Sequence, residues 1–176
     1  MRYAFLVESY ATERIKVASV WSEFKDEDLP FRPREGDPRG RSLHEQMVHQ
    51  CVSEDLWFRN MLGIDVGAPP LPARETRMEF IRQYAENSAK RLVILRAKDE
   101  TWWESDTKFF EVERSRAWVM VRRMTHTSHH RGQLMANYAP TIYAYGSLEE
   151  LFSGESRGGM KARLPGAGGK AVTERP

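Results

Sequence analysis

Residues 126–134 read His-Thr-Ser-His-His-Arg-Gly-Gln-Leu and hold three of the five histidines in the 176-residue chain. The stretch lies within a proline-free segment, 115–138, that predicts a long helix. At about 100° per residue, His126 and His130 lie about 40° apart and one turn along this helix, so both imidazoles can reach one metal ion. His129 lies about 60° from His126 in the opposite direction. A metal bound by His126 and His130 would therefore leave His129 outside the site.

The remaining histidines, His44 and His49, lie in a second proline-free segment, 43–62, which also predicts a helix. His49 is the better candidate for a third ligand, while His44 points about 140° away on the same helix. Taken alone, His49 fits a hydrogen-bonded core histidine better, and it becomes a ligand candidate only together with His126 and His130. We expect His44 to be a first-turn residue beside the helix cap at Ser42. Three histidine ligands would leave a fourth position open for water or substrate, which is typical of catalytic rather than structural zinc sites.

The helix face that carries His126 also permits a simpler interpretation. The other residues on this face are mostly polar: Val119, Arg122, Gln133 and Asn137. A polar stripe on a helix is more often a solvated face than a binding site. Two features favour the metal site. The same helix has a separate apolar arc, and Gly132 in its middle costs about 1 kcal/mol relative to alanine and so requires a packing reason.

Proline placement and apolar side chains at helical spacing predict an all-α fold. Ser42 and Thr76 each begin a capping-box pattern, and Gly63 is a helix-ending residue. The apolar stripes with the clearest spacing are Val17, Val20, Trp21 and Phe24, and Phe80, Tyr84, Leu92 and Leu95. The predicted helices span roughly residues 3–25, 43–62, 77–97 and 115–138.

Two segments lie outside these helices. Residues 99–107, around Trp102 and Trp103, are predicted to be a connection, and no stretch alternates clearly enough to predict a sheet. Residues 153–176 hold half of the chain's 12 glycines and almost no large apolar side chains, so we expect a flexible tail. The domain organisation expected is a four-helix bundle over residues 1–152 followed by this tail.

Charge and composition exclude several classes of protein. The chain's net charge is +2, but the tail at residues 153–176 carries +3, so residues 1–152 sum to −1 and have no basic surplus for nucleic acid. No stretch is long and apolar enough for a membrane span, and charges throughout the first thirty residues argue against a secretory signal. The single cysteine, Cys51, rules out an internal disulfide, and we expect a cytoplasmic protein.

Two stretches together resemble the DinB-like (DinB/YfiT-like) family of metalloenzymes. One is the histidine-rich run at residues 126–134, and the other is residues 48–57, Val-His-Gln-Cys-Val-Ser-Glu-Asp-Leu-Trp. The resemblance covers roughly residues 1–145, and the segment at residues 135–146 departs from the family's usual last helix. It implies a four-helix bundle, often a homodimer, with a divalent metal such as zinc or nickel. The ligands that it implies are His49, His126 and His130.

The resemblance and the open coordination position together favour a metal-dependent enzyme of the thiol S-transferase or isomerase type. Relatives use a low-molecular-weight thiol, mycothiol or bacillithiol, so we expect a small-molecule substrate and no nucleic acid or membrane partner. The alternative is a non-catalytic metal-binding stress protein whose metal stabilises the bundle or a dimer. No catalytic side chain is assigned by the sequence: Glu45 and Glu54 could act as acid or base but are more often surface charges, and Cys51 is expected to pack. Arg131 and Gln133 could orient ligands or fix helix packing.

Overall fold

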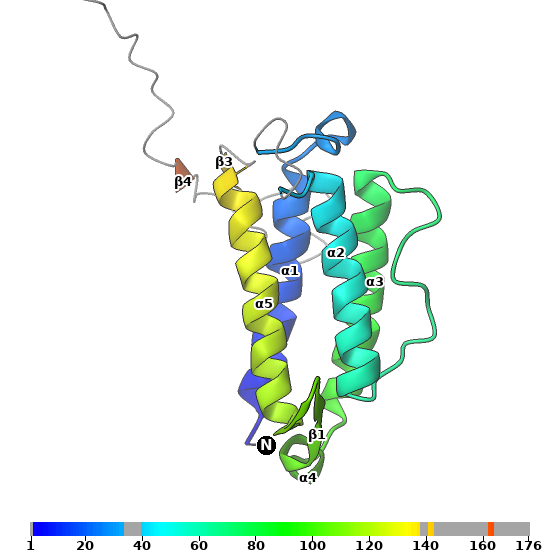
Figure 1. The fold of residues 1–176 in the computed structure, drawn as a ribbon, viewed down its shortest axis with the longest axis vertical. Coiled ribbons are helices and arrows are strands. Elements are labelled where there is room, and N and C mark those ends of the chain that lie inside the picture. The colour runs from blue at the N-terminus through cyan, green and yellow to red at the C-terminus, as the bar shows by residue number, and fades with distance from the viewer. Residues whose placement is uncertain (1, 34–39, 138–140, 143–161, 164–176) are drawn as a thin grey trace, which may run out of the picture.

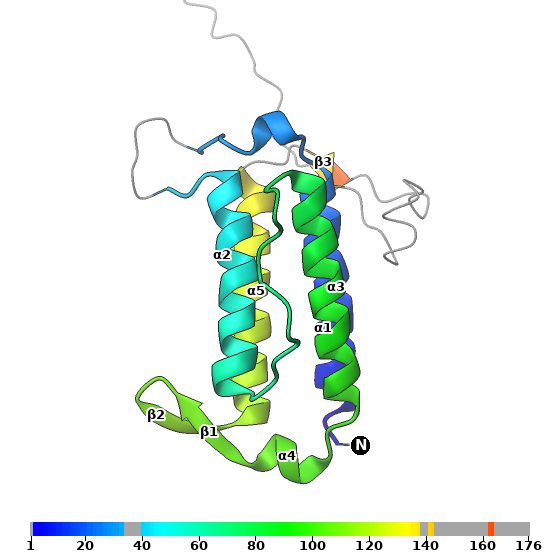
Figure 2. The ribbon, with the colours of Figure 1, turned by 90° about the vertical axis from the view of Figure 1, so that its right-hand side faces the viewer.

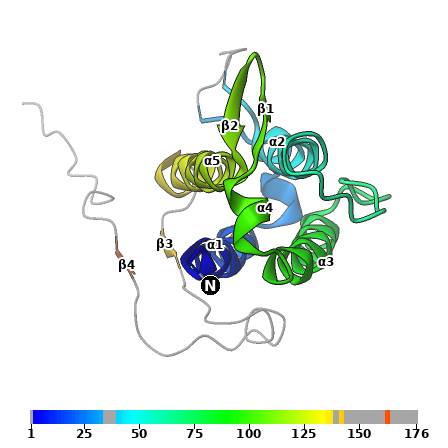
Figure 3. The same cartoon turned by 90° about the horizontal axis from the view of Figure 1, so that it is seen from below.

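The computed structural model describes residues 2–33, 40–137, 141–142 and 162–163. The described chain is mostly helical, as predicted, and its long helices lie side by side (Figures 1 and 3). Helices α1 and α5 run in one direction, and α2 and α3 run in the other (Figure 1). The bounds of these helices are α1 Ala4–Ser22, α2 Leu43–Leu56, α3 Arg77–Arg96 and α5 Arg116–Asn137.

The predicted connection before α5 contains more regular structure than expected. Helix α4 (Glu100–Glu104) is followed by a hairpin of β1 (Asp106–Phe109) and β2 (Val112–Ser115), whose strands pair antiparallel. The expectation that no sheet forms is therefore wrong, because the alternation over these four-residue strands is too short to detect in the sequence. A second antiparallel pair joins β3 (Thr141–Ile142) to β4 (Ala162–Arg163).

The ends of α2 follow from local sequence. The Ser42 hydroxyl accepts a hydrogen bond from the Glu45 amide at 3.1 Å, and the Glu45 carboxylate accepts one from the Ser42 amide at 2.7 Å, which confirms the predicted capping box. Beyond Leu56 the helix continues as a π-helical turn, η2 (Trp57–Met61). Gly63 then adopts φ +66°, the left-handed conformation that ends the helix. At α3, Thr76 caps the Glu79 amide as predicted.

The predicted apolar stripes form the interior. Trp21 and Phe80 belong to one buried cluster near one end of the long helices, and Phe58 and Trp103 belong to a second cluster near the other end. Cys51 is 4% exposed in the first cluster, which agrees with its predicted packing role. The connection between α2 and α3 runs along the outside of these two helices (Figure 2), and the carbonyl of its Pro69 accepts hydrogen bonds from α3.

The packing reason expected at Gly132 is absent from the described part of the chain. A Cβ atom built on Gly132 meets no other atom within 4 Å. Since glycine costs about 1 kcal/mol relative to alanine in a helix interior, we expect Gly132→Ala to raise the free energy of unfolding by about that amount. Urea denaturation of both proteins measures the difference. A destabilised variant would show that this position faces a close neighbour.

Some expectations lie outside the described residues. The flexible tail predicted at residues 153–176 is described only at Ala162–Arg163, and the departure noted at residues 135–146 is described in part. No helix in the described ranges is both long and apolar enough to cross a membrane.

Candidate metal centre

Helices α2 and α5 bring together His49, His126 and His130, the three histidines proposed as ligands from the sequence. The Nε2 atom of His130 lies 3.0 Å from Nε2 of His49 and 3.1 Å from Nε2 of His126. One ring nitrogen from each residue lies within 4.8 Å of the others, and we call His49, His126 and His130 the His triad. His130 is only 6% exposed, so the polar face that contains it is not simply a solvated surface.

A glutamine sets the orientation of the His130 ring. The Gln133 side chain lies one turn further along α5, and its Oε1 atom lies 2.8 Å from Nδ1 of His130. The Gln46 side chain on α2 donates to the same oxygen at 3.4 Å. Since an amide oxygen only accepts, the proton of His130 is on Nδ1 and the lone pair of Nε2 faces the other two rings.

The His126 ring is positioned by stacking. The ring of Trp57, the first residue of η2, lies parallel to it, with ring centroids 5.7 Å apart and planes 13° apart. The guanidinium of Arg123 in turn lies 5.5 Å from the centre of the Trp57 ring. Nδ1 of His126 is buried without a hydrogen-bond partner among the described residues, so the aromatic contact takes the place of a polar one.

Burial and nearby positive charge keep the triad neutral. Burial, with smaller contributions from Arg41, His130 and Arg123, lowers the pKa of His49 to about 4. Burial, followed by Arg123, His130 and the neighbouring histidines, lowers the pKa of His126 to about 3. Burial also lowers the pKa of His130. Neutral imidazoles near pH 7 have the free lone pairs that a metal ion requires.

The donor set of the triad fits a divalent metal. Three imidazole nitrogens at bond lengths of about 2.0–2.1 Å around a tetrahedral ion lie roughly 3.3 Å apart. Two separations in the triad, 3.0 and 3.1 Å from His130 Nε2, are close to this value, and all three ligand atoms lie within 4.8 Å of one another. Without a cation, the single lone pair of His130 Nε2 would have to satisfy both neighbouring rings. The three residues could therefore hold a divalent metal ion.

Comparison with known proteins identifies the family. The DinB family profile matches residues 3–137, most of the chain. The chain belongs to the DinB family. Its fold is similar to a DinB-like protein from Bacillus subtilis, with a TM-score of 0.60, 17% identity, and coverage of 75% of this chain and 87% of the other. A DinB-like protein from Bacillus cereus gives a TM-score of 0.64 and 14% identity, covering 88% and 95%. No curated protein matches in sequence.

The other two histidines of this DinB family protein lie outside the triad. Nε2 of His44 contacts the carboxylate of Glu75 in the connection before α3, and His44 is a first-turn residue of α2 as expected. His129 is exposed on α5 and does not contribute to the triad, which agrees with its predicted angle. Arg131 pairs with Glu13 of α1 at 2.6 Å and so fixes helix packing.

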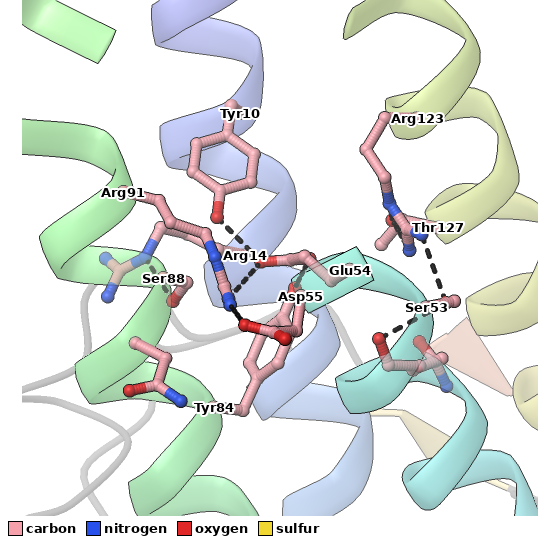
Figure 4. Close-up of polar contacts among 12 residues, drawn as sticks. Tyr10, Arg14, Ser53, Glu54, Asp55, Tyr84, Ser88, Arg91, Arg123 and Thr127 are labelled. Carbon is pink, nitrogen blue, oxygen red and sulfur yellow. Dashed lines mark hydrogen bonds and ion pairs between the residues drawn. The ribbon is translucent and has the colours of Figure 1, made fainter. Parts of the chain in front are cut away.

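The two carboxylates considered as acid or base are both occupied. Glu45 closes the capping box of α2 and pairs with Arg32 at 2.6 Å. Glu54 is 1% exposed, so the interpretation of it as a surface charge is wrong. Its carboxylate accepts hydrogen bonds from Tyr10 at 2.7 Å, Tyr84 at 3.2 Å and Arg91 at 3.2 Å (Figure 4).

These contacts join three helices through buried polar groups. Tyr10 comes from α1, Glu54 from α2, and Tyr84 and Arg91 from α3 (Figure 4). Arg91 also pairs with Asp55 at 3.0 Å. A buried carboxylate with these partners supports helix packing and is not free to exchange protons with a substrate.

Sequence reasoning missed Arg123 and Ser53 as parts of the site. Arg123 is 1% exposed and donates to Thr127 Oγ1 at 2.8 Å and to Ser53 Oγ at 3.1 Å (Figure 4). Its position on the apolar arc of α5, beside Met120 and Met124, is the signal that could have found it, because an arginine on a core-facing arc is rarely solvated.

Gln133 provides a test of the triad's hydrogen bonding. We expect Gln133→Leu to weaken zinc binding by about 10–100-fold, because His130 loses the acceptor that fixes its tautomer. Gln133→Glu keeps an acceptor oxygen and should retain binding close to wild type. Competition with a chromophoric chelator measures both affinities. Equal affinities for the leucine variant and wild type would exclude a role for Gln133 in positioning His130.

Proposed function

We propose that this DinB family protein is a metal-dependent enzyme of the thiol S-transferase or isomerase type, built on a four-helix bundle. The observation that carries the proposal is the convergence of His49, His126 and His130 through their Nε2 atoms. A divalent ion held by three neutral histidines would lower the pKa of a bound thiol or water and so supply a nucleophile near neutral pH.

The protein's own residues would position this nucleophile rather than provide one. Cys51 is buried among apolar side chains, and burial raises the pKa of its thiol, so it is not a reactive thiolate. Gln133 orients the His130 ring and Trp57 orients the His126 ring. These contacts would hold the ligand geometry while a small-molecule substrate enters from the open side of the site.

An activity screen tests the catalytic part of the proposal. Protein loaded with zinc or nickel is incubated with small thiols, including mycothiol and bacillithiol, and with electrophilic or isomerisable co-substrates. Turnover that is lost in His130→Ala, while circular dichroism shows an intact fold, supports the enzyme. The expected control, His129→Ala, keeps full turnover because His129 lies outside the triad.

One observation favours the alternative of a non-catalytic metal-binding protein. The triad joins α2 to α5, so a bound ion would cross-link two helices and stabilise the bundle. This function predicts a large rise in the melting temperature with metal and no turnover in any screen. We also propose a homodimer. It is supported by four exposed apolar side chains in or near the hairpin: Phe110, Val112, Trp118 and Val121. Size-exclusion chromatography with light scattering measures the mass of the protein in solution.

A further inference from the structure

An apolar ridge runs along α2 beside the His triad. Val48, Val52 and Leu56 follow one another at four-residue spacing, so they form a continuous line about 12 Å long on one face of the helix. They line a cleft of about 490 Å³. Leu56 is 46% exposed, which shows that the ridge is open to solvent along part of its length.

The cleft reaches the triad itself. His44, Glu45, His49 and Ser53 line it together with the apolar ridge. His49 and Ser53 contact residues of α5, and we call these two the polar edge of the cleft. The Ser53 hydroxyl accepts a hydrogen bond from Arg123, and Nε2 of His49 contacts His130. A ligand lying in the cleft would therefore place one end beside the triad and the rest of its length along the ridge.

A buried positive charge lies directly behind the polar edge of the cleft, in contact with Ser53. Arg123 is buried, its hydrogen-bond partners are the hydroxyls of Ser53 and Thr127, and no carboxylate within the described ranges pairs with it.

The two carboxylates of the described chain nearest this edge have partners other than Arg123. Glu54 is held by Tyr10, Tyr84 and Arg91. Glu45 also lines the cleft, one helical turn before His49, and its carboxylate is held by Arg32 and the Ser42 amide.

We propose that the cleft binds a small amphiphile with a single anionic head group, such as a carboxylate or thiolate, at His49 and Ser53 and an apolar body along Val48, Val52 and Leu56. The inference rests on the site of the proposed function and names the class of its substrate. Charge complementarity selects the anionic head, and the exposed ridge selects the apolar body. A small polar anion would match only the head-group site, and a cationic amphiphile would match only the ridge.

Calorimetric titration of the full-length, zinc-loaded protein tests this inference with three probes. Octanoate carries both features, acetate carries only the anionic head, and octylamine carries the same chain on a cation. We expect octanoate to bind at least about tenfold more tightly than acetate, because its chain is buried on the ridge. We expect octylamine to bind more weakly than octanoate. Equal affinities for octanoate and acetate, or for octanoate and octylamine, would overturn the inference.

Two matched surface variants locate the binding. Leu56→Ser removes an exposed apolar side chain from the ridge and should weaken octanoate binding about tenfold while leaving acetate binding unchanged. Val93→Ser removes a comparable side chain, 65% exposed on α3, and should change neither affinity. An unchanged octanoate affinity in Leu56→Ser would contradict the assignment to this cleft.

The metal content of the same samples separates the two proposals. If the zinc-loaded protein shows no preference for octanoate, the metal site stands and the proposed substrate class is wrong. If the protein takes up no zinc but still prefers octanoate, and this preference still depends on Leu56, the proposed substrate class stands and the metal-dependent function is wrong.

Discussion

Glu54→Leu should lower the free energy of unfolding by about 3–5 kcal/mol. Glu54 is 1% exposed and Arg91 is 2% exposed, so the substitution leaves the Arg91 guanidinium buried with one of its two carboxylate partners removed. The hydroxyls of Tyr10 and Tyr84 lose their acceptor at the same time. The cost comes mainly from these uncompensated buried groups.

An exposed ion pair provides the matched control for this prediction. Glu104 pairs with Arg2 at 2.9 Å, and their side chains are 49% and 70% exposed. Glu104→Leu should therefore cost no more than about 1 kcal/mol. Urea denaturation of the three proteins gives the comparison. Equal destabilisation by the two substitutions would show that the Glu54 contacts do not hold α1, α2 and α3 together.

His130→Ala should reduce zinc affinity by more than about 100-fold, beyond the effect expected for a residue that only supports a ligand. His130 is central to the triad, because its Nε2 atom contacts the Nε2 atoms of both His49 and His126. Its removal leaves two nitrogens on different helices and no third ligand within the triad. Competition with a chelator of known affinity measures the loss.

The remaining histidines serve as controls for that measurement. His129→Ala changes the neighbouring residue on α5, which is exposed, and His44→Ala changes a histidine of α2 that contacts Glu75. Both variants should bind zinc within about threefold of wild type, since neither residue belongs to the triad. A large loss in His129→Ala would show that the ligand set is different.

Helical periodicity predicts much of the arrangement because each long helix buries one face. The angles of His126, His129 and His130 along α5 correctly separate the triad members from the exposed residue. The capping residues Ser42 and Gly63 can also be recognised in the sequence, because capping depends only on neighbouring residues. That His49 meets the α5 pair is a tertiary contact, which spacing alone permits and the family resemblance makes specific.

Features that depend on tertiary contacts escape the sequence. From the sequence Glu54 is expected to be a surface carboxylate, because its partners Tyr10, Tyr84 and Arg91 lie on other helices. The hairpin of β1 and β2 has strands of four residues, too short for alternation to be informative. Trp57, which stacks on His126, is the first residue of the π-helical turn η2, and the sequence pattern predicts neither the turn nor the stacking.

Elemental analysis of the purified full-length protein tests the central claim most directly. The His triad should hold about one divalent ion per chain after incubation with zinc or nickel and removal of excess metal. The bound metal should fall sharply when His49, His126 or His130 is replaced by alanine. Wild-type protein that keeps all three histidines, yet remains free of metal after incubation with both zinc and nickel, would contradict the account.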